Sequence, residues 1–314
     1  MTTHSLTVLK ELLGKHKKNP NDYGIVYLKN PSAPMVTVQQ SYEILKADLL
    51  GKVTYQKPKP KVYFEDEVGK HLFDMLVGAL QHQCNTLKEE GNLRGNISQE
   101  YASKIKCRLE NIKKYSHAAS LIKPVVTSLG CEELLRFSQA DRPYSDQVIF
   151  LLDGDARHKQ TEHKPKIREY LDRKYDPHKD HISDRETNRN NICFFPDYFA
   201  PESFLYRIIY QIVDAESNHA VFWRTLDQQE ETALYTASKI RAWFVDLASD
   251  FNNDDLKNIF GDVEKNGKVW AFINATNLLN YYYGDYSTIE ELILFFEKFD
   301  RAFQMTYSKM IKNI

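Results

Sequence analysis

Hydrophobic and polar positions follow one another along this chain in a way that predicts short buried strands separated by amphipathic helices. Residues 148–152 form an uninterrupted apolar run, as expected of a strand buried on both faces. A second strand is predicted at residues 61–65 and a third at 124–128. Apolar residues at helical spacing predict a helix from about Val68 to Leu87. This order of strands and helices predicts an α/β fold with a parallel sheet.

Helical patterns surround this core and divide the chain into three predicted parts. Ser98 can cap a helix that runs to about Tyr115, so residues 78–120 are expected to form a helical insertion. The other predicted elements are strands within 23–38 and helices at 4–17, 39–49, 131–137, 232–248 and 287–312. We expect an amino-terminal segment of residues 1–55, a sheet domain of 56–215 and an all-helical carboxyl-terminal lobe of 216–314.

Acidic residues follow two of the predicted strands directly. Asp153-Gly154-Asp155 comes after the 148–152 strand, and Glu65-Asp66-Glu67 stands at the end of the 61–65 strand. Carboxylates two residues apart on an extended backbone point to the same side, and a glycine between them leaves room for a ligand. Such carboxylates repel each other unless a cation lies between them, and hard oxygen ligands favour Mg²⁺ or Mn²⁺. The alternative is that Asp-Gly-Asp is an ordinary turn.

Three segments in order, Phe64-Glu65, Val125 to Gly130 and Leu152 to Asp155, resemble the Toprim domain. Toprim domains are the metal-dependent phosphodiester-cutting modules of topoisomerases, primases and OLD-family nucleases. The resemblance implies a Toprim-like parallel sheet with flanking helices, and one or two Mg²⁺ or Mn²⁺ ions. It also implies that Glu65, Asp153 and Asp155 are catalytic residues and metal ligands. Two ions about 4 Å apart would stabilise both the attacking and the leaving oxygen of a phosphodiester.

Two further acids enter through the same resemblance. The segment Phe194 to Ser203 is similar to the proline-rich strand-to-helix segment of OLD-type domains, which implies that Glu202 is a metal ligand. Many Toprim sequences have Gly directly after the glutamate and Asp four residues after it, where this chain has Asp66 and Gly69. Glu65, Asp66 and Glu67 therefore remain alternatives for the acid that faces the metal.

The amino-terminal sequence Thr2-Thr-His4-Ser5 resembles the histidine switch of ABC-type ATPases, which precede the Toprim domain in OLD-family proteins. No phosphate-binding G-x-x-x-x-G-K-[ST] sequence occurs in the chain, so it cannot bind a nucleotide in that way. We expect residues 1–55 to dock on an ABC-type ATPase or to mediate self-association. The simpler alternative is that Thr-His-Ser caps a helix.

Charge and composition limit the partners. The net charge of −1 argues against a wholly basic nucleic-acid coat, so binding requires a local patch. The polar stretch 157–191 directly follows Asp155 and offers basic candidates for contacts with a phosphate backbone: Arg157, Lys159, Lys164, Lys166 and Arg168. We expect DNA in preference to RNA. The four cysteines lack metal-site spacing, and no signal peptide or membrane-length apolar run is evident, which favours a cytoplasmic protein that does not enter a membrane.

The sequence therefore predicts a divalent-metal-dependent endonuclease that works with an ATPase, as such pairs do in bacterial defence against phage. One alternative is a non-catalytic subunit that keeps the Toprim fold as a scaffold for an ATPase. A HAD-type phosphatase also begins with Asp-x-Asp after a strand, but it requires Thr or Val two residues past the second Asp, where Arg157 stands.

Overall fold

A computed structural model describes residues 59–89, 91–140, 145–157, 167–171, 190–214, 219–248 and 251–312, with isolated positions before residue 59. Residues 60–306 form one compact unit, and residues 1–59 with 307–314 form another. The predicted division at 215 and 216 therefore lies inside a single unit. In the amino-terminal unit, β1 (Val26–Tyr27) pairs antiparallel with β2 (Met35–Val36), as the strands predicted within 23–38 require. His4 and, apart from residues 11 and 15, the helices predicted at 4–17 and 39–49 lie outside the described residues.

The larger unit is built around a four-stranded sheet in which every neighbouring pair is parallel. The strand order is β4-β3-β5-β6. The strands are β3 (Lys61–Phe64), β4 (Lys123–Val126), β5 (Val148–Leu152) and β6 (Ile192–Phe194). Phe64 of β3 aligns with Val126 on one side and with Leu151 on the other, so the carboxyl ends of three strands lie level. The predicted α/β class is confirmed.

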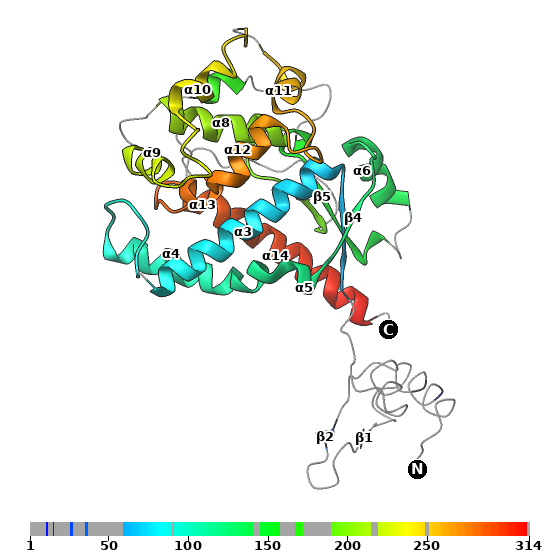
Figure 1. Ribbon diagram of the computed structural model, residues 1–314. Helices are drawn as coiled ribbons and strands as arrows, with labels where there is room; N and C mark the ends of the chain where they lie inside the picture. The colour runs from blue at the N-terminus through cyan, green and yellow to red at the C-terminus, as the bar shows by residue number, and fades with distance from the viewer. Residues whose placement is uncertain are drawn as a thin grey trace. The chain divides into compact units, whose positions relative to one another are not determined.

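Apolar side chains fill both faces of this sheet, which explains why β5 is buried along its whole length. On one face, Val148, Phe150 and Leu152 pack with residues of α6 (Cys131–Ala140). On the other face, Phe64 meets Phe73 of α3 (Glu67–Glu89) at 5.5 Å between ring centres. Phe73 in turn packs on aromatic side chains of α14 (Ile289–Lys312). Figure 1 shows α3 and α14 together on this side.

Helices connect and surround the strands much as their hydrophobic spacing predicts. The helix that follows β3, α3 (Glu67–Glu89), is longer by a residue or two at each end than predicted. Ser98 caps α4 (Gln99–Ile112) by accepting a hydrogen bond from the Tyr101 amide at 3.2 Å. Further helices are η1 (Lys113–His117), α5 (Ala118–Leu121), α8 (Pro201–Asp214), α9 (Ala220–Asp227), α10 (Ala237–Ala242), α11 (Asn253–Phe260), α12 (Lys268–Thr276) and α13 (Leu278–Tyr282).

The predicted long helix at 232–248 is wrong in extent. Only Ala237–Ala242 is helical there, and Thr236 begins that helix by accepting a hydrogen bond from the Lys239 amide. Residues 232–235 instead form turns, in which the Thr232 hydroxyl donates to the Leu226 carbonyl. Ser and Thr side chains compete with helical hydrogen bonding in this way, which apolar spacing alone does not reveal.

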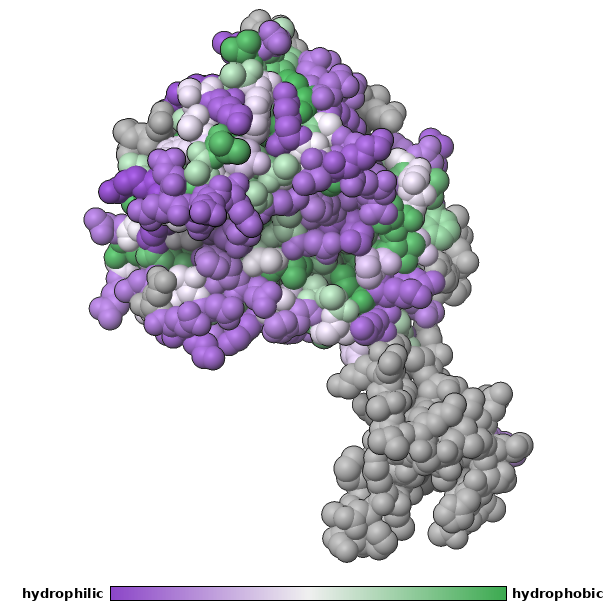
Figure 2. Space-filling view, in the orientation of Figure 1, coloured by the Kyte–Doolittle hydropathy of each residue, from purple (hydrophilic) through white to green (hydrophobic). Residues whose placement is uncertain are grey.

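The visible surface of the larger unit is mainly hydrophilic. In Figure 2 the hydrophobic side chains of this face lie in small areas between hydrophilic ones. No helix in the described ranges has the length and apolar content needed to cross a bilayer.

Candidate functional site

The acids predicted at the strand ends lie at the point where the sheet topology changes direction. From β3 the chain continues to β4 on one side, whereas from β5 it continues to β6 on the other. Ligands of open α/β sheets bind in the crevice outside the carboxyl ends of such a strand pair. Glu65 follows β3 and Asp153 follows β5, so both acids belong to this crevice.

Glu65 reaches across from β3 to the tip of β5. Its Oε1 accepts a hydrogen bond from the Asp153 amide at 3.0 Å, and its carboxylate also accepts one from the Cys131 amide at the start of α6. Burial raises the pKa of Glu65 to about 7, and the nearby Asp155 and Asp66 raise it too, whereas the two amide hydrogen bonds lower it. With this raised pKa, the Glu65 carboxyl group changes between its protonated and ionised forms near neutral pH.

The side chain of Asp153 is half-buried, and one of its carboxylate oxygens is enclosed. Its Oδ1 is buried and has no hydrogen-bond partner. Burial raises the pKa of Asp153 well above its usual value, and the charges of Glu65 and Asp66 raise it further. A buried acceptor oxygen without a donor is costly, so this atom is a candidate to bind a cation or a proton donor.

Asp66, which we predicted only as an alternative to Glu65, lies beside Asp153. Its Oδ1 accepts a hydrogen bond from the Gly69 amide at 2.8 Å and so caps the start of α3. A β-carbon added at Gly69 would lie 3.5 Å from Asp153 Oδ1 and 3.6 Å from Asp66 Oδ1. Both carboxylates therefore border the same glycine, at the amino-terminal end of α3 where the helix dipole favours negative charge.

The remaining predicted acids differ in their surroundings. Asp155 is half-buried on η2 (Gly154–Arg157) and close enough to raise the pKa of Glu65 and Asp153. Glu202 is buried in the first turn of α8, and its charge also raises the pKa of Asp153. Glu67, by contrast, is exposed in the first turn of α3. Five carboxyl groups thus influence one another at this edge, and they are Glu65, Asp66, Asp153, Asp155 and Glu202.

Two residues of a distant helix act on the Glu202 carboxylate, and the sequence did not predict their involvement. Burial raises the pKa of Glu202, while a hydrogen bond from Asn253 and the charge of Lys257 lower it. Asn253 also accepts a hydrogen bond from the Ser203 hydroxyl at 2.5 Å. Both Asn253 and Lys257 belong to α11, so this helix fixes the start of α8.

Only glycine fits at position 154, because backbone oxygens of the turn after β6 occupy the space that a side chain would need. A β-carbon at this position would lie 2.7 Å from the Phe199 carbonyl oxygen, 2.8 Å from that of Asp197 and 3.0 Å from that of Pro196. Ordinary β-carbons do not come so close to backbone oxygens. The glycine thus lets the turn after β6 pack directly against the Asp-Gly-Asp segment, rather than leaving space there for a ligand.

Substitution of Gly154 should therefore destabilise the protein. We expect Gly154→Ala to lower the free energy of unfolding by about 1–3 kcal/mol, because the backbone must move to admit the methyl group. Gly78→Ala is the matched control, since Gly78 lies on the exposed side of α3 with nothing within 4 Å of the added carbon. That variant should gain about 0.5–1 kcal/mol from helix propensity. Equal stabilities of the two variants in urea unfolding would contradict the packing described here.

The basic residues predicted for nucleic-acid contact fall into three groups. Lys159, Lys164 and Lys166 lie outside the described residues. Arg168 is exposed on η3 (Ile167–Tyr170). Arg157 is only 6% exposed, and its guanidinium donates hydrogen bonds to the carbonyls of Phe195 and Asp197. The Arg157 guanidinium therefore faces backbone carbonyls inside the protein, where a phosphate backbone does not reach it.

The acid cluster suits a hard divalent cation in its chemistry but is not arranged around one. In the described part of the chain, no three His, Cys, Asp or Glu side chains are grouped as metal ligands. The donors are nevertheless carboxylate oxygens, one of which is the buried, unpartnered Oδ1 of Asp153. Binding of a cation therefore requires side-chain rotation that brings these oxygens together.

Comparisons of this chain with family models, curated proteins and solved structures return no match. The resemblance to Toprim domains accordingly rests on the motif residues and their order along the chain.

Proposed function

We propose that the acid edge of the sheet is the centre of a divalent-metal-dependent nuclease. The observation that carries the proposal is the buried Oδ1 of Asp153, which lacks a partner although four other carboxyl groups surround it. Placing several partly buried acids next to one another is unfavourable, and functional sites are where such arrangements persist. The strand order supports the proposal because it brings Glu65 and Asp153 to the crevice where α/β proteins bind ligands.

Within this proposal, each acid has a role that follows from its position. Asp153 and Asp155 would hold Mg²⁺ or Mn²⁺, with Glu202 as a further ligand from α8. A bound ion of this kind stabilises charge on phosphoryl oxygens and makes bound water more acidic. Glu65 can accept a proton from the attacking water near neutral pH, because its pKa is about 7. The water oxygen would then bond to phosphorus while the bond to the leaving ester oxygen breaks, and that oxygen would keep the electron pair and take up a proton from solvent.

Partners enter the proposal from the sequence. Lys159, Lys164, Lys166 and the exposed Arg168 would contact the phosphate backbone, with DNA favoured over RNA. The histidine-switch-like segment at His4 motivates an ABC-type ATPase as the regulatory partner, with bacterial anti-phage defence in the cytoplasm as the setting.

A cleavage assay tests the proposal directly. Supercoiled plasmid, linear duplex and structured RNA are incubated with the full chain in Mg²⁺, in Mn²⁺ or in EDTA, with and without an ABC-type ATPase. We expect nicked or linear DNA in the presence of metal and none in EDTA, nor with the Asp153→Asn variant. Absence of cleavage under all metal conditions, with the ATPase present, would overturn the proposal.

The lack of a grouped set of three ligands in the described residues favours a second candidate. In that case the chain is a non-catalytic scaffold that binds an ATPase. The scaffold hypothesis predicts that the wild-type and Asp153→Asn proteins change the activity of the ATPase equally. It also predicts that neither protein cleaves nucleic acid.

A further inference from the structure

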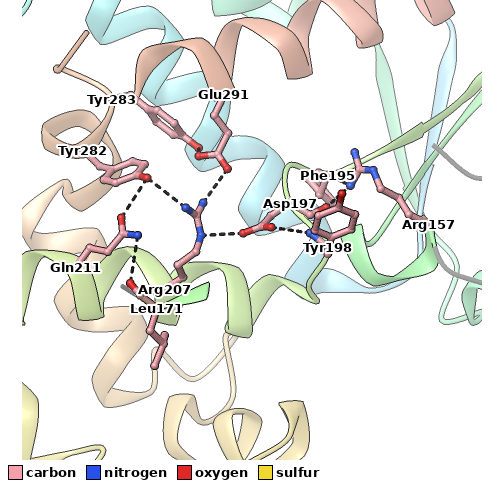
Figure 3. A network of polar contacts seen from close by, with 10 residues as sticks. All are labelled: Arg157, Leu171, Phe195, Asp197, Tyr198, Arg207, Gln211, Tyr282, Tyr283 and Glu291. Atoms are coloured by element: carbon pink, nitrogen blue, oxygen red, sulfur yellow. Dashed lines mark hydrogen bonds and ion pairs between the residues drawn. The ribbon is translucent and has the colours of Figure 1, made fainter. Parts of the chain in front are cut away.

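A buried arginine joins the helical part of the larger unit to the turn that follows β6. Arg207 of α8 is 3% exposed, and its Nε lies 2.8 Å from Asp197 Oδ2. Its Nη2 lies 2.7 Å from Oε1 of Glu291 on α14. Tyr283 donates a hydrogen bond to the second oxygen of Glu291, and Tyr282 lies 3.5 Å from Arg207 Nη1. Figure 3 shows how these side chains converge on the guanidinium from three directions.

Asp197 has a backbone conformation that needs support. Its φ angle is 68°, in the left-handed region that costs a non-glycine residue about 1 kcal/mol or more. One carboxylate oxygen accepts a hydrogen bond from the Tyr198 amide at 2.8 Å, which ties the Asp197 side chain to the backbone of the turn. The other oxygen binds Arg207. The arginine thus holds the side chain that maintains the turn.

The same turn encloses the Asp-Gly-Asp segment. Carbonyl oxygens of Pro196, Asp197 and Phe199 lie at the position that a side chain on Gly154 would occupy. Arg157, which ends η2, donates hydrogen bonds to carbonyls of the same turn. Arg157 therefore binds the turn from the β5 side, and Arg207 binds it from α8. A shift of the turn would move Gly154 and, with it, the acids on either side.

We infer that Arg207 is a positioning residue for Asp153 and Asp155, acting through Asp197 and the turn. This inference rests on the proposed function, since it concerns the same acids. The inference extends the site to the helical region, because Glu291 of α14 forms an ion pair with the Nη2 atom of Arg207. A buried ion pair is by itself weak evidence for stability, and its main effect here is to fix one arrangement of the turn.

The experiment compares Arg207→Lys with Arg108→Lys. Arg108 is a matched control because, like Arg207, it forms ion pairs with two carboxylates, here Glu290 and Glu297 of α14, at 2.8 Å from its Nη1 and its Nε. These ion pairs connect Arg108 of α4 to α14 and not to the turn after β6. For each variant and the wild type, we would measure the urea midpoint of unfolding, the Mn²⁺ dissociation constant by calorimetry, and kcat and KM for DNA cleavage.

We expect both variants to be less stable, but only Arg207→Lys to bind Mn²⁺ at least about 10-fold more weakly and to lose kcat in proportion. Asp197→Asn serves as the second variant if Arg207→Lys does not fold, because it keeps the oxygen that accepts the Tyr198 amide hydrogen while weakening the ion pair with Arg207. It should show the same loss of Mn²⁺ affinity. Wild-type Mn²⁺ affinity and kcat in both Arg207→Lys and Asp197→Asn would overturn the inference. A wild-type protein that neither binds Mn²⁺ nor cleaves DNA would instead overturn the proposed function on which the inference rests.

Discussion

Asp153→Asn should abolish metal-dependent cleavage, with a loss of at least about 100-fold in kcat, or about 3 kcal/mol of transition-state stabilisation. Asn has nearly the shape of Asp but lacks the charge that would hold a cation. Asp155→Asn should reduce cleavage similarly. Full activity in Asp153→Asn, measured by single-turnover plasmid cleavage, would exclude this residue from the chemistry.

The same substitution separates a functional acid from a structural one. Burial and the neighbouring acids raise the pKa of Asp153, so its ionised form is unfavourable in the metal-free protein. We therefore expect metal-free Asp153→Asn to melt at the same temperature as the wild type or higher, while its activity is lost. A large drop in melting temperature would mean that Asp153 serves the fold.

Glu65→Gln should be far more damaging to cleavage than Asp66→Asn. Glu65 joins the tips of β3 and β5 and has a pKa of about 7, which suits a base at neutral pH. Asn at position 66 keeps the oxygen that accepts the Gly69 amide hydrogen, so α3 keeps its cap. We expect a loss of about 100-fold or more for Glu65→Gln and less than about 10-fold for Asp66→Asn. The reverse order of kcat values would assign the central role to Asp66.

The raised pKa of Glu65 also predicts a pH dependence of stability. In the unfolded chain this carboxyl group has an ordinary pKa of 4.5, against about 7 in the folded protein. The folded protein thus holds a proton between pH 4.5 and 7 that the unfolded chain has released, so stability falls as pH rises through this window. For the metal-free protein we expect this group to remove up to about 3 kcal/mol by pH 8. Glu65→Gln should flatten that part of the curve in urea unfolding at pH 4.5 to 8, and an unchanged slope would contradict the raised pKa.

Much of the fold follows from patterns that lie close together in the sequence. The apolar run at residues 148–152 predicts a strand buried on both faces, and the spacing of Leu72, Phe73 and Leu76 predicts α3. The order of elements then leads to the parallel sheet. The prediction of a helix at 232–248 was wrong in extent because hydroxyl side chains and turns, rather than apolar spacing, decide the structure of this segment.

The sequence predicted the acids at the ends of the strands and, through the resemblance to OLD-type domains, Glu202 of α8, but not their supporting contacts. Asp66 was ambiguous because strand alternation does not continue past Phe64, where the chain turns into α3. Arg157 was misread because basic residues in a polar stretch suggest solvent, whereas this one binds carbonyls of a turn 38 to 40 residues away. Arg207 and Asn253 act across contacts between distant segments, and no local pattern identifies such partners.

Binding of Mn²⁺ to the full chain, without nucleic acid, is the most direct test of a metal centre at this edge. Isothermal calorimetry at pH 8 would compare the wild type with Asp153→Asn, since competition from protons on Glu65 is smallest above its pKa of about 7. We predict saturable binding of one or two ions by the wild type and its loss in Asp153→Asn. No saturable binding by the wild type at millimolar Mn²⁺, or equal binding by both proteins, would contradict the account.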